Sequence, residues 1–328
     1  MRASLPISAP TASAVASLSL AATLLLGSCS KSPVAPRPTE PIGIPNPPFI
    51  PPPRAYPIRH LDPSWGPGTR LAYFDTGLLK IEGGREVIDK ALKGAWLLDT
   101  SSGERRLLFP LAPPAYGSSW SPDGTRLVYS DYSNLSVVDA TSGESRPLMT
   151  FAYPAGAYDP AWSPDGSTIA FTYVPPNSGW AEWSVRTVSL DGKRLTQIAT
   201  GYSDPAWHPE GLVMHEPSGR GIYLWRASTG EVVKIRDITE FQVGDVAASP
   251  DGSRISMTPL GYGALWVMEF DGSNVRMLAD HVIARHSWSR DGRSIAFSRD
   301  DWTTDNPENG VLWKIDVASG ETVQLTRH

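Results

Sequence analysis

A tryptophan followed by a proline-aspartate-glycine turn and a short apolar run recurs along this chain, and it constrains the fold more than any other feature. Clear copies read SWSPDGTRLVYS from Ser119, AWSPDGSTIAFTY from Ala161 and SWSRDGRSIAFSR from Ser287. Alignment on the tryptophan gives anchor positions separated by 55, 42, 45, 41 and 40 residues: Trp65, Trp120, Trp162, Trp207, Ala248 and Trp288. Such a period is typical of one four-stranded blade, so six copies predict a six-bladed β-propeller.

Each repeat reads as four strands. The first ends at the tryptophan, and Pro-Asp-Gly then makes a tight turn, because proline presets φ and glycine accepts positive φ. The second alternates large and small apolar residues, as in Leu127-Val128-Tyr129, which suits a sheet covered on both faces. We therefore expect an all-β fold of antiparallel blades over residues 61–328. One stretch with a helical period, Arg85–Lys93, interrupts the first repeat.

Residues 1–28 have the features of an export signal. The apolar run Ala14–Gly27 is too short to span a bilayer comfortably. Leu26-Gly27-Ser28 directly before Cys29 resembles the lipobox of bacterial lipoproteins, which implies acylation of Cys29 and attachment to a lipid bilayer. Cys29 is the only cysteine, so no intramolecular disulfide forms. Serine at position 30 implies, by the same resemblance, the outer membrane. The alternative is an ordinary signal followed by an unrelated cysteine.

Residues 29–60 form the second predicted segment. Proline recurs there every few residues, which removes backbone donors and favours polyproline II. About 30 residues at about 3.1 Å each would reach on the order of 90 Å. We expect a disordered tether between the lipid and the propeller. The alternative is a proline-rich ligand for the aromatic groove of a partner.

The charge and the motifs exclude several functions. A net charge of −5 without a basic cluster argues against nucleic acid as a partner. The sequence contains no G-x-S-x-G, G-x-x-x-x-G-K or H-E-x-x-H motif and no cysteine pair. We therefore expect no cofactor and no dedicated metal site, and favour a monomeric propeller that is not an enzyme.

The combination of W-S-P-D-G, an apolar strand, D-x-x-S-G and Q-L-T resembles the propeller repeats of the TolB family, a WD-repeat-like class. The resemblance covers essentially all of residues 61–328 and implies the fold, since the matching residues form turns and core. The chain departs from TolB in having a proline-rich segment before the propeller instead of a folded domain. The family's envelope complex with a peptidoglycan-associated lipoprotein implies a protein or peptide partner in the cell envelope.

The residues three positions before the anchors mark a candidate site. Equivalent positions of a propeller form a ring, and here they are Asp62, Gly117, Asp159, Asp204, Asp245 and Arg285. We therefore predict four carboxylates at one rim of the channel, with Arg285 and His286 beside them. Such a rim would attract a basic peptide terminus or a cation. The alternative is that each aspartate caps the start of its own strand.

Further candidates lie near the channel and in two loops. His208 and His286 flank anchors, and oligogalacturonate lyases, which are similar to this propeller class, gather metal-binding histidines at the channel. The alternative function is therefore a metal-assisted polysaccharide lyase or hydrolase. Trp180 falls outside the repeat and is predicted to contact a partner, or else to pack on its own blade. The acidic loop 299–310 lacks EF-hand spacing and reads as a solvated loop.

These observations favour one function. The sequence predicts a lipid-anchored binding or scaffold protein of the cell envelope, exported and facing the periplasm. It would recognise a protein or peptide through its propeller loops and its channel mouth.

Overall fold

The computed structural model describes residues 60–76, 78–82, 85–89, 93–110, 115–299 and 311–326. The predicted signal, Cys29, the tether up to residue 59 and residues 300–310 of the acidic loop lie outside this part. Apart from the short 3-10 helix η2 (Trp180–Glu182), the described elements are all strands. Within the same ranges, no helix has the length and hydropathy needed to cross a membrane.

The strands form six blades of four antiparallel strands, as the sequence predicts. The first three blades, from the inner to the outer strand, are β1 (His60–Trp65), β2 (Arg70–Asp75), β5 (Gly94–Asp99) and β6 (Arg105–Pro110); β7 (Ser118–Trp120), β8 (Arg126–Ser130), β9 (Asn134–Asp139) and β10 (Ser145–Thr150); β11 (Gly156–Trp162), β12 (Thr168–Val174), β13 (Ser184–Ser189) and β14 (Leu195–Thr200).

The last three blades are continuous in sequence as well. They comprise β15 (Ser203–His208), β16 (Gly211–His215), β17 (Gly221–Arg226) and β18 (Val232–Asp237); β19 (Val243–Ala248), β20 (Arg254–Pro259), β21 (Tyr262–Glu269) and the first part of β22 (Arg276–Trp288); the rest of β22, β23 (Ser294–Arg299), β24 (Val311–Asp316) and β25 (Thr322–Gln324). Strand β22 serves two blades, because it pairs with β21 at Arg276↔Val267 and with β23 at Trp288↔Ile295.

The one stretch with a helical period, Arg85–Lys93, is not helical where the structure describes it. The stretch with a helical period begins with a strand, β4 (Arg85–Asp89), which pairs with β3 (Leu78–Glu82) in a separate two-stranded sheet. Residues 90–92 of that stretch lie outside the described part. Strand pairing therefore overrides the local helical pattern over Arg85–Asp89.

The hydrophobic core is divided among the contacts between blades. Among the described residues, each of the six blade-to-blade contacts holds its own apolar cluster. In the third blade, Ile169 and Phe171 pack toward the second blade, while Ala170 packs toward the fourth. All three side chains are fully buried. Burial of each large one contributes roughly 1.5–3 kcal/mol, so each blade depends on both neighbours for its stability.

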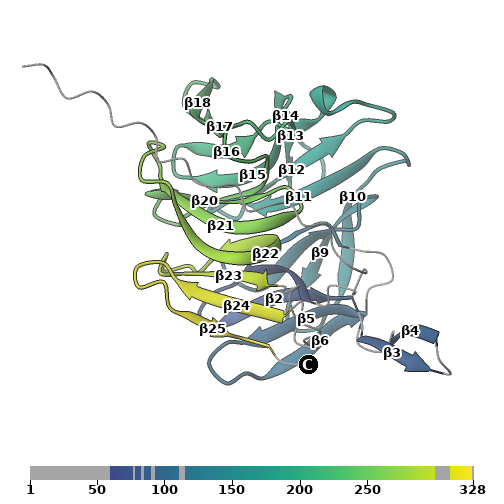
Figure 1. Cartoon of the computed structure of the whole chain (residues 1–328). Helices are drawn as coiled ribbons and strands as arrows, with labels where there is room; N and C mark the ends of the chain where they lie inside the picture. The colour runs from purple at the N-terminus through teal and green to yellow at the C-terminus, as the bar shows by residue number, and fades with distance from the viewer. Residues whose placement is uncertain are drawn as a thin grey trace, which may run out of the picture. The chain divides into compact units, whose positions relative to one another are not determined.

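The ring closes between the sixth and the first blade by the contacts that join other neighbours. Trp65 donates its backbone N–H to Ser287 Oγ at 2.9 Å, just as Trp162 donates to Ser119 Oγ at 3.0 Å. Strand β1 also packs against β22 and β23, and Figure 1 shows yellow β23 and β24 beside purple β2. The sixth blade has its four strands in β22–β25, and among the described residues no strand from the start of the chain joins it.

The two faces of the ring differ. Inner strands end at the face that carries the tight turns after the anchor positions, which we call the turn face. They begin at the opposite face, the loop face, beside the connections between second and third strands, as the pair Gly156↔Val174 shows. The long connection 175–183 lies at the loop face, and the chain enters the propeller there at His60.

Candidate binding site at the channel

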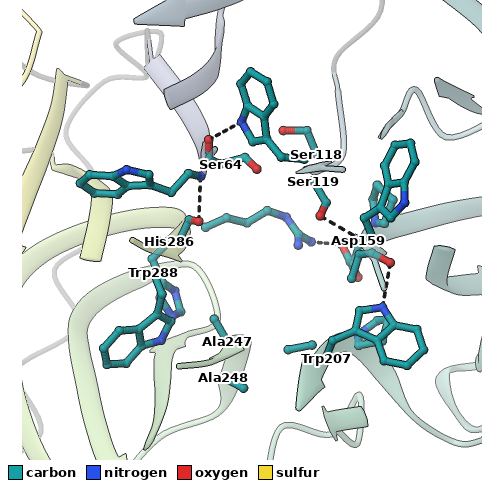
Figure 2. A pocket seen from close by; sticks show the side chains of 18 of the residues that line it. Ser64, Ser118, Ser119, Asp159, Trp207, Ala247, Ala248, His286 and Trp288 are labelled. Atoms are coloured by element: carbon teal, nitrogen blue, oxygen red, sulfur yellow. Dashed lines mark hydrogen bonds and ion pairs between the residues drawn. The ribbon is translucent and has the colours of Figure 1, made fainter. Parts of the chain in front are cut away.

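A cavity of about 670 Å³ lies in the channel, lined by residues of the inner strands of all six blades. The predicted ring residues lie toward the loop face, and the prolines of the turns lie toward the turn face. Figure 2 shows Asp159 and His286 on opposite sides of this cavity. Between Trp288 and Trp207, Figure 2 shows the short side chains of Ala247 and Ala248 at the wall.

Local backbone geometry turns the aspartates into the channel. The pairing of β1, β11 and β15 with their neighbours shifts at a bulge around Asp62, Asp159 and Asp204. Their φ values are 50°, 58° and 58°, in the left-handed region that aspartate tolerates better than most residues. A bulge re-aims the side chain at its position, and here it directs three carboxylates toward the same point.

Arg285 occupies the centre of the predicted ring. Its Nη1 lies 3.1 Å from Asp204 Oδ1 and 3.6 Å from Asp245 Oδ1, and its Nε lies 4.0 Å from Asp62 Oδ1. Its Nη2 pairs with Asp159 Oδ1. We call these five residues the acid cluster. The structure thus brings the predicted residues together, but it places a cation of the chain itself where the sequence analysis expects an external one.

The carboxylates also join neighbouring blades. Asp204 Oδ2 accepts a hydrogen bond from the backbone N–H of Val246 at 2.7 Å, and Asp245 Oδ2 accepts one from the N–H of His286 at 3.2 Å. Asp62 accepts a backbone hydrogen bond from Gly117. Each of these amides belongs to another blade, so the alternative in which each aspartate caps its own strand is wrong for these three.

Burial changes the protonation of the acid cluster. It raises the pKa of Asp62 and raises that of Asp245 to about 7. It also raises the pKa of Asp204 well above its usual value, and the charge of Asp245 and a hydrogen bond between the two carboxyls add to this effect. Asp204 and Asp245 therefore retain protons at pH values at which exposed aspartates have lost them.

His286 joins the acid cluster to the core. Its Nδ1 lies 2.6 Å from Asp245 Oδ2, and its Nε2 lies 2.7 Å from Ser256 Oγ. The order Asp-His-Ser is that of a hydrolase triad, but Ser256 is fully buried and accepts a hydrogen bond from Trp288 Nε1 at 2.7 Å. Burial lowers the pKa of His286 to about 3. The neutral ring therefore connects Asp245 to Ser256, and the chain of bonds positions Trp288.

His208 fills a gap between the fourth and fifth blades. An added Cβ at Gly66, the residue after Trp65, would touch Trp120 of the next blade. His208 stands in the corresponding place after Trp207, where the next anchor is the small Ala248. Its ring stacks on Phe270 with centroids 3.9 Å apart. The large residue after one anchor thus compensates for the small residue at the next.

The two histidines do not form a metal site with the acid cluster. His208 Nε2 lies 2.9 Å from Gly252 O, and its Nδ1 accepts the N–H of Glu210 at 3.1 Å. His286 Nε2 is hydrogen-bonded to Ser256 Oγ, and its Nδ1 lies 2.6 Å from Asp245 Oδ2. Across the described ranges, no group of three or more histidine, cysteine, aspartate or glutamate side chains could hold a metal ion.

The loop face carries an aromatic cluster that the sequence analysis misses: Tyr116, Tyr132, Tyr158 and Trp183. The predicted contact residue Trp180 lies on η2 in the adjoining connection and is 55% exposed. A comparison of the residues four positions before the anchors would have found two members of the cluster, since Tyr116 and Tyr158 take that position in the second and third blades.

Comparison with known proteins agrees with this fold. The family described as TolB beta propeller domain matches residues 104–327, and the comparison with curated proteins finds no match. The solved structure of TolB from Acinetobacter baumannii is similar with a TM-score of 0.63 and 17% identity, over 78% of this chain and 64% of that one. The chain thus spans slightly less than two thirds of that protein.

Two further solved structures are similar. The putative TolB from Agrobacterium tumefaciens has a TM-score of 0.60 and 17% identity, over 70% of this chain and 87% of that one. An oligogalacturonate lyase in complex with manganese has a TM-score of 0.52 and 15% identity, over 82% of this chain and 78% of that one. At these identities the likeness establishes the fold alone, because one fold hosts many functions.

Proposed function

The chain belongs to the family of TolB β-propeller domains, and from that premise we propose that it is a binding or scaffold protein of the cell envelope. It recognises a protein or peptide through the loop face and the mouth of the channel. The observation that carries this proposal is the acid cluster, which presents four carboxyl groups against one guanidinium at the channel. An excess of acid groups suits a partner that brings a lysine, an arginine or a free amino terminus.

The difference between the two faces supports this choice of surface. The turn face consists of short turns held by internal hydrogen bonds, such as Ser163 Oγ to Asp165 Oδ1 at 2.6 Å. The loop face carries the longer connections and exposes Tyr153, Trp180 and Leu260 at 83%, 55% and 57%. Exposed aromatic side chains on loops above a rigid scaffold are typical of recognition surfaces.

The proposal includes a location. The Leu-Gly-Ser-Cys sequence that ends at Cys29 supports acylation of that cysteine, and Ser30 supports the outer membrane, facing the periplasm. The proline-rich segment would then separate the propeller from the bilayer. A metal-assisted polysaccharide lyase gains no support from the histidines, since both ring nitrogens of His208 and Nε2 of His286 are hydrogen-bonded, and His286 Nδ1 lies 2.6 Å from Asp245 Oδ2.

The test identifies the partner first and then weakens the acid cluster. The full chain is crosslinked in its native envelope, and the co-purified protein is identified by mass spectrometry. The double variant Asp159→Asn and Asp204→Asn keeps side-chain shape and removes two acid groups. We expect it to bind the partner 10- to 100-fold more weakly, because a hydrogen bond to a charged group contributes about 1.5–3 kcal/mol.

The matched control is Asp165→Asn, which changes an aspartate on the turn face. Its affinity should equal that of the unchanged chain, and the melting temperature of each variant shows whether the ring stays folded. Equal affinity of the double variant would leave the acid cluster a purely structural role. Recovery of a tightly bound sugar in place of a protein would contradict the proposed class of partner.

A further inference from the structure

The aromatic cluster is a preformed surface rather than part of the core between blades. The ring centroids of Tyr116 and Tyr158 lie 5.0 Å apart edge to face, and Tyr132 lies 5.2 Å from Tyr158. Trp183 stacks on Tyr158 at 6.0 Å. All four side chains are partly exposed. Their rings thus support one another and leave edges and faces open to a ligand.

The position of Tyr132 is maintained against backbone strain. Its φ is 78°, a rare conformation for a bulky residue. Three contacts hold it there: its N–H donates to Ser130 Oγ at 3.0 Å, its O accepts the N–H of Ala157 at 2.8 Å, and its hydroxyl donates to Pro154 O at 2.5 Å. Enforced strain of this kind is found at functional sites, which makes the cluster a candidate binding surface.

The aromatic cluster also carries hydrogen-bond donors that have no acceptor in the described part of the chain. Within the described residues, the hydroxyls of Tyr116 and Tyr158 and the indole N–H of Trp183 have no hydrogen-bond partner. Burial raises the pKa of Tyr158 to about 12, which keeps its hydroxyl protonated. A complementary ligand offers flat apolar rings and free carbonyl acceptors. Polyproline II offers both, because its backbone makes no internal hydrogen bonds, and it docks into aromatic-lined grooves.

We propose that the chain's own proline-rich segment, residues 45–57, docks on the aromatic cluster. This segment, PNPPFIPPPRAYP, holds seven prolines in thirteen residues and precedes β1 by two residues. Its prolines pack on the rings of the cluster, and its carbonyls accept the free hydroxyl and indole donors. The inference does not depend on the identity of any partner of the propeller.

The register of the inner strands places the start of β1, which the segment precedes, on the same face as the cluster. Leu61, Tyr116 and Tyr158 all stand four residues before their anchors. Strand β1 of the first blade lies against β7 of the second, and β7 against β11 of the third. The chain therefore enters β1 from the proline-rich segment at the same level of the ring as the two tyrosines. Thirteen residues of polyproline II extend about 40 Å, which exceeds what contact between neighbouring blades requires.

Charge favours the same occupant. The segment carries one charged residue, Arg54, and no acidic one. The acid cluster adjoins the aromatic cluster, since Asp159 directly follows Tyr158. A docked segment therefore brings a guanidinium near an excess of carboxyl groups. It also covers aromatic surface of the loop face, so a partner that binds there would have to displace it.

Site-specific photocrosslinking of the full chain in detergent tests the proposal. Phe49 is replaced by benzoylphenylalanine, the sample is irradiated, and the crosslinked peptides of the monomer band are identified by mass spectrometry. We expect crosslinks to peptides that contain Tyr116, Tyr132, Tyr158 or Trp183. Tyr158→Phe, which removes one donor and keeps the ring, should lower the yield two- to five-fold, and Tyr158→Ala should lower it further.

The matched control is Leu195→Ala, which changes a side chain on the outer strand β14 that is 42% exposed. Its yield should equal that of the unchanged protein, and circular dichroism confirms that each variant is folded. Crosslinks found in a dimer band alone would assign the surface to the segment of a second copy and overturn the inference. Crosslinks elsewhere on the propeller, or yields insensitive to both Tyr158 variants, would overturn it as well.

Discussion

Arg285 takes the ring position at which four other blades present an aspartate, and its length allows it to reach all four carboxyl groups. A buried charge is costly without a partner, and removal of one partner from a buried pair is strongly destabilising. Because three of the aspartates also bond amides of another blade, the acid cluster joins the inner strands as well as setting the charge of the channel.

The raised pKa of Asp245 has a consequence for stability. Its carboxyl titrates at about 7 in the folded protein and near 3.8 when unfolded, so the folded state binds more protons between these values. The free energy of unfolding contributed by this group therefore falls as the pH rises from about 4 to about 7. Asp245→Asn cannot titrate. Relative to the unchanged protein, we expect the variant to gain roughly 2–4 kcal/mol over this window.

Urea unfolding at several pH values between 4 and 8 measures this gain. The comparison must be a difference between two proteins, because His286, whose pKa is lowered to about 3, contributes a slope of opposite sign to both. Arg285 and Asp204 face the same carboxyl, and in the variant the pKa of Asp204 loses the raising effect of Asp245, so the pH dependence of Asp204 weakens and adds to the gain. A free-energy difference that stays constant across the window would contradict the raised pKa of Asp245.

Among the elements, the residue directly after an anchor and the anchor of the next blade have complementary sizes: where one is large, the other is small. After the first anchor, the small Gly66 faces the large Trp120, which is the anchor of the second blade. After the fourth anchor stands the large His208, and the anchor of the fifth blade is the small Ala248. The motif alone identifies Ala248 as an exception. The motif does not reveal that His208 compensates for the small side chain of Ala248, because this relation depends on which face of the strand the anchor occupies.

This matching predicts coupling between two substitutions. His208→Ser should destabilise the fold by roughly 1–3 kcal/mol through a cavity and a lost stacking contact with Phe270, and Ala248→Trp should destabilise it through overlap with His208. The double variant restores the combination found between other blades. We expect it to cost at least about 1 kcal/mol less than the sum of the single changes, as measured by chemical denaturation. Strict additivity would show that the two positions are independent.

The elements themselves were largely predictable. Turn chemistry and alternating apolar residues predict the strands of each blade, because tight turns and burial on two faces leave few other solutions. The exception is β4, where a local helical period competes with pairing to β3. The direction of side chains is harder to predict, since the bulge at Asp159 and the reach of Arg285 arise from contacts between blades.

For the whole molecule, equivalence between repeats predicts which residues meet at the channel. The sequence analysis places Asp62, Asp159, Asp204 and Asp245 on one ring, and the structure brings them together around Arg285. It misses the aromatic cluster, because Tyr132 and Trp183 lie in loops whose positions depend on neighbouring blades. Repetition is informative about the shared scaffold and uninformative about what distinguishes one blade from the next.

The proposed lipid anchor makes a prediction about the whole chain. Cys29→Ser removes the only thiol, so we expect the protein to lose fatty-acid labelling and to move from the membrane fraction to the soluble fraction. Its melting temperature should not change, because Cys29 lies outside the propeller. Fractionation after labelling with an alkyne-tagged fatty acid measures both effects. Continued labelling of the variant would contradict acylation at Cys29.

Because β1 and β25 each pair inside their own blade, the ring has a seam between the sixth and the first blade. In the part of the chain that the structure describes, side-chain packing and the bond from Trp65 to Ser287 hold this seam, and no strand crosses it. Duplication or deletion of one of the first four repeats, whose sheets share no strand with a neighbour, leaves every remaining sheet intact and changes only the angle at which neighbours meet. The architecture therefore allows evolution to alter the number of blades without first dismantling an interlocked closure.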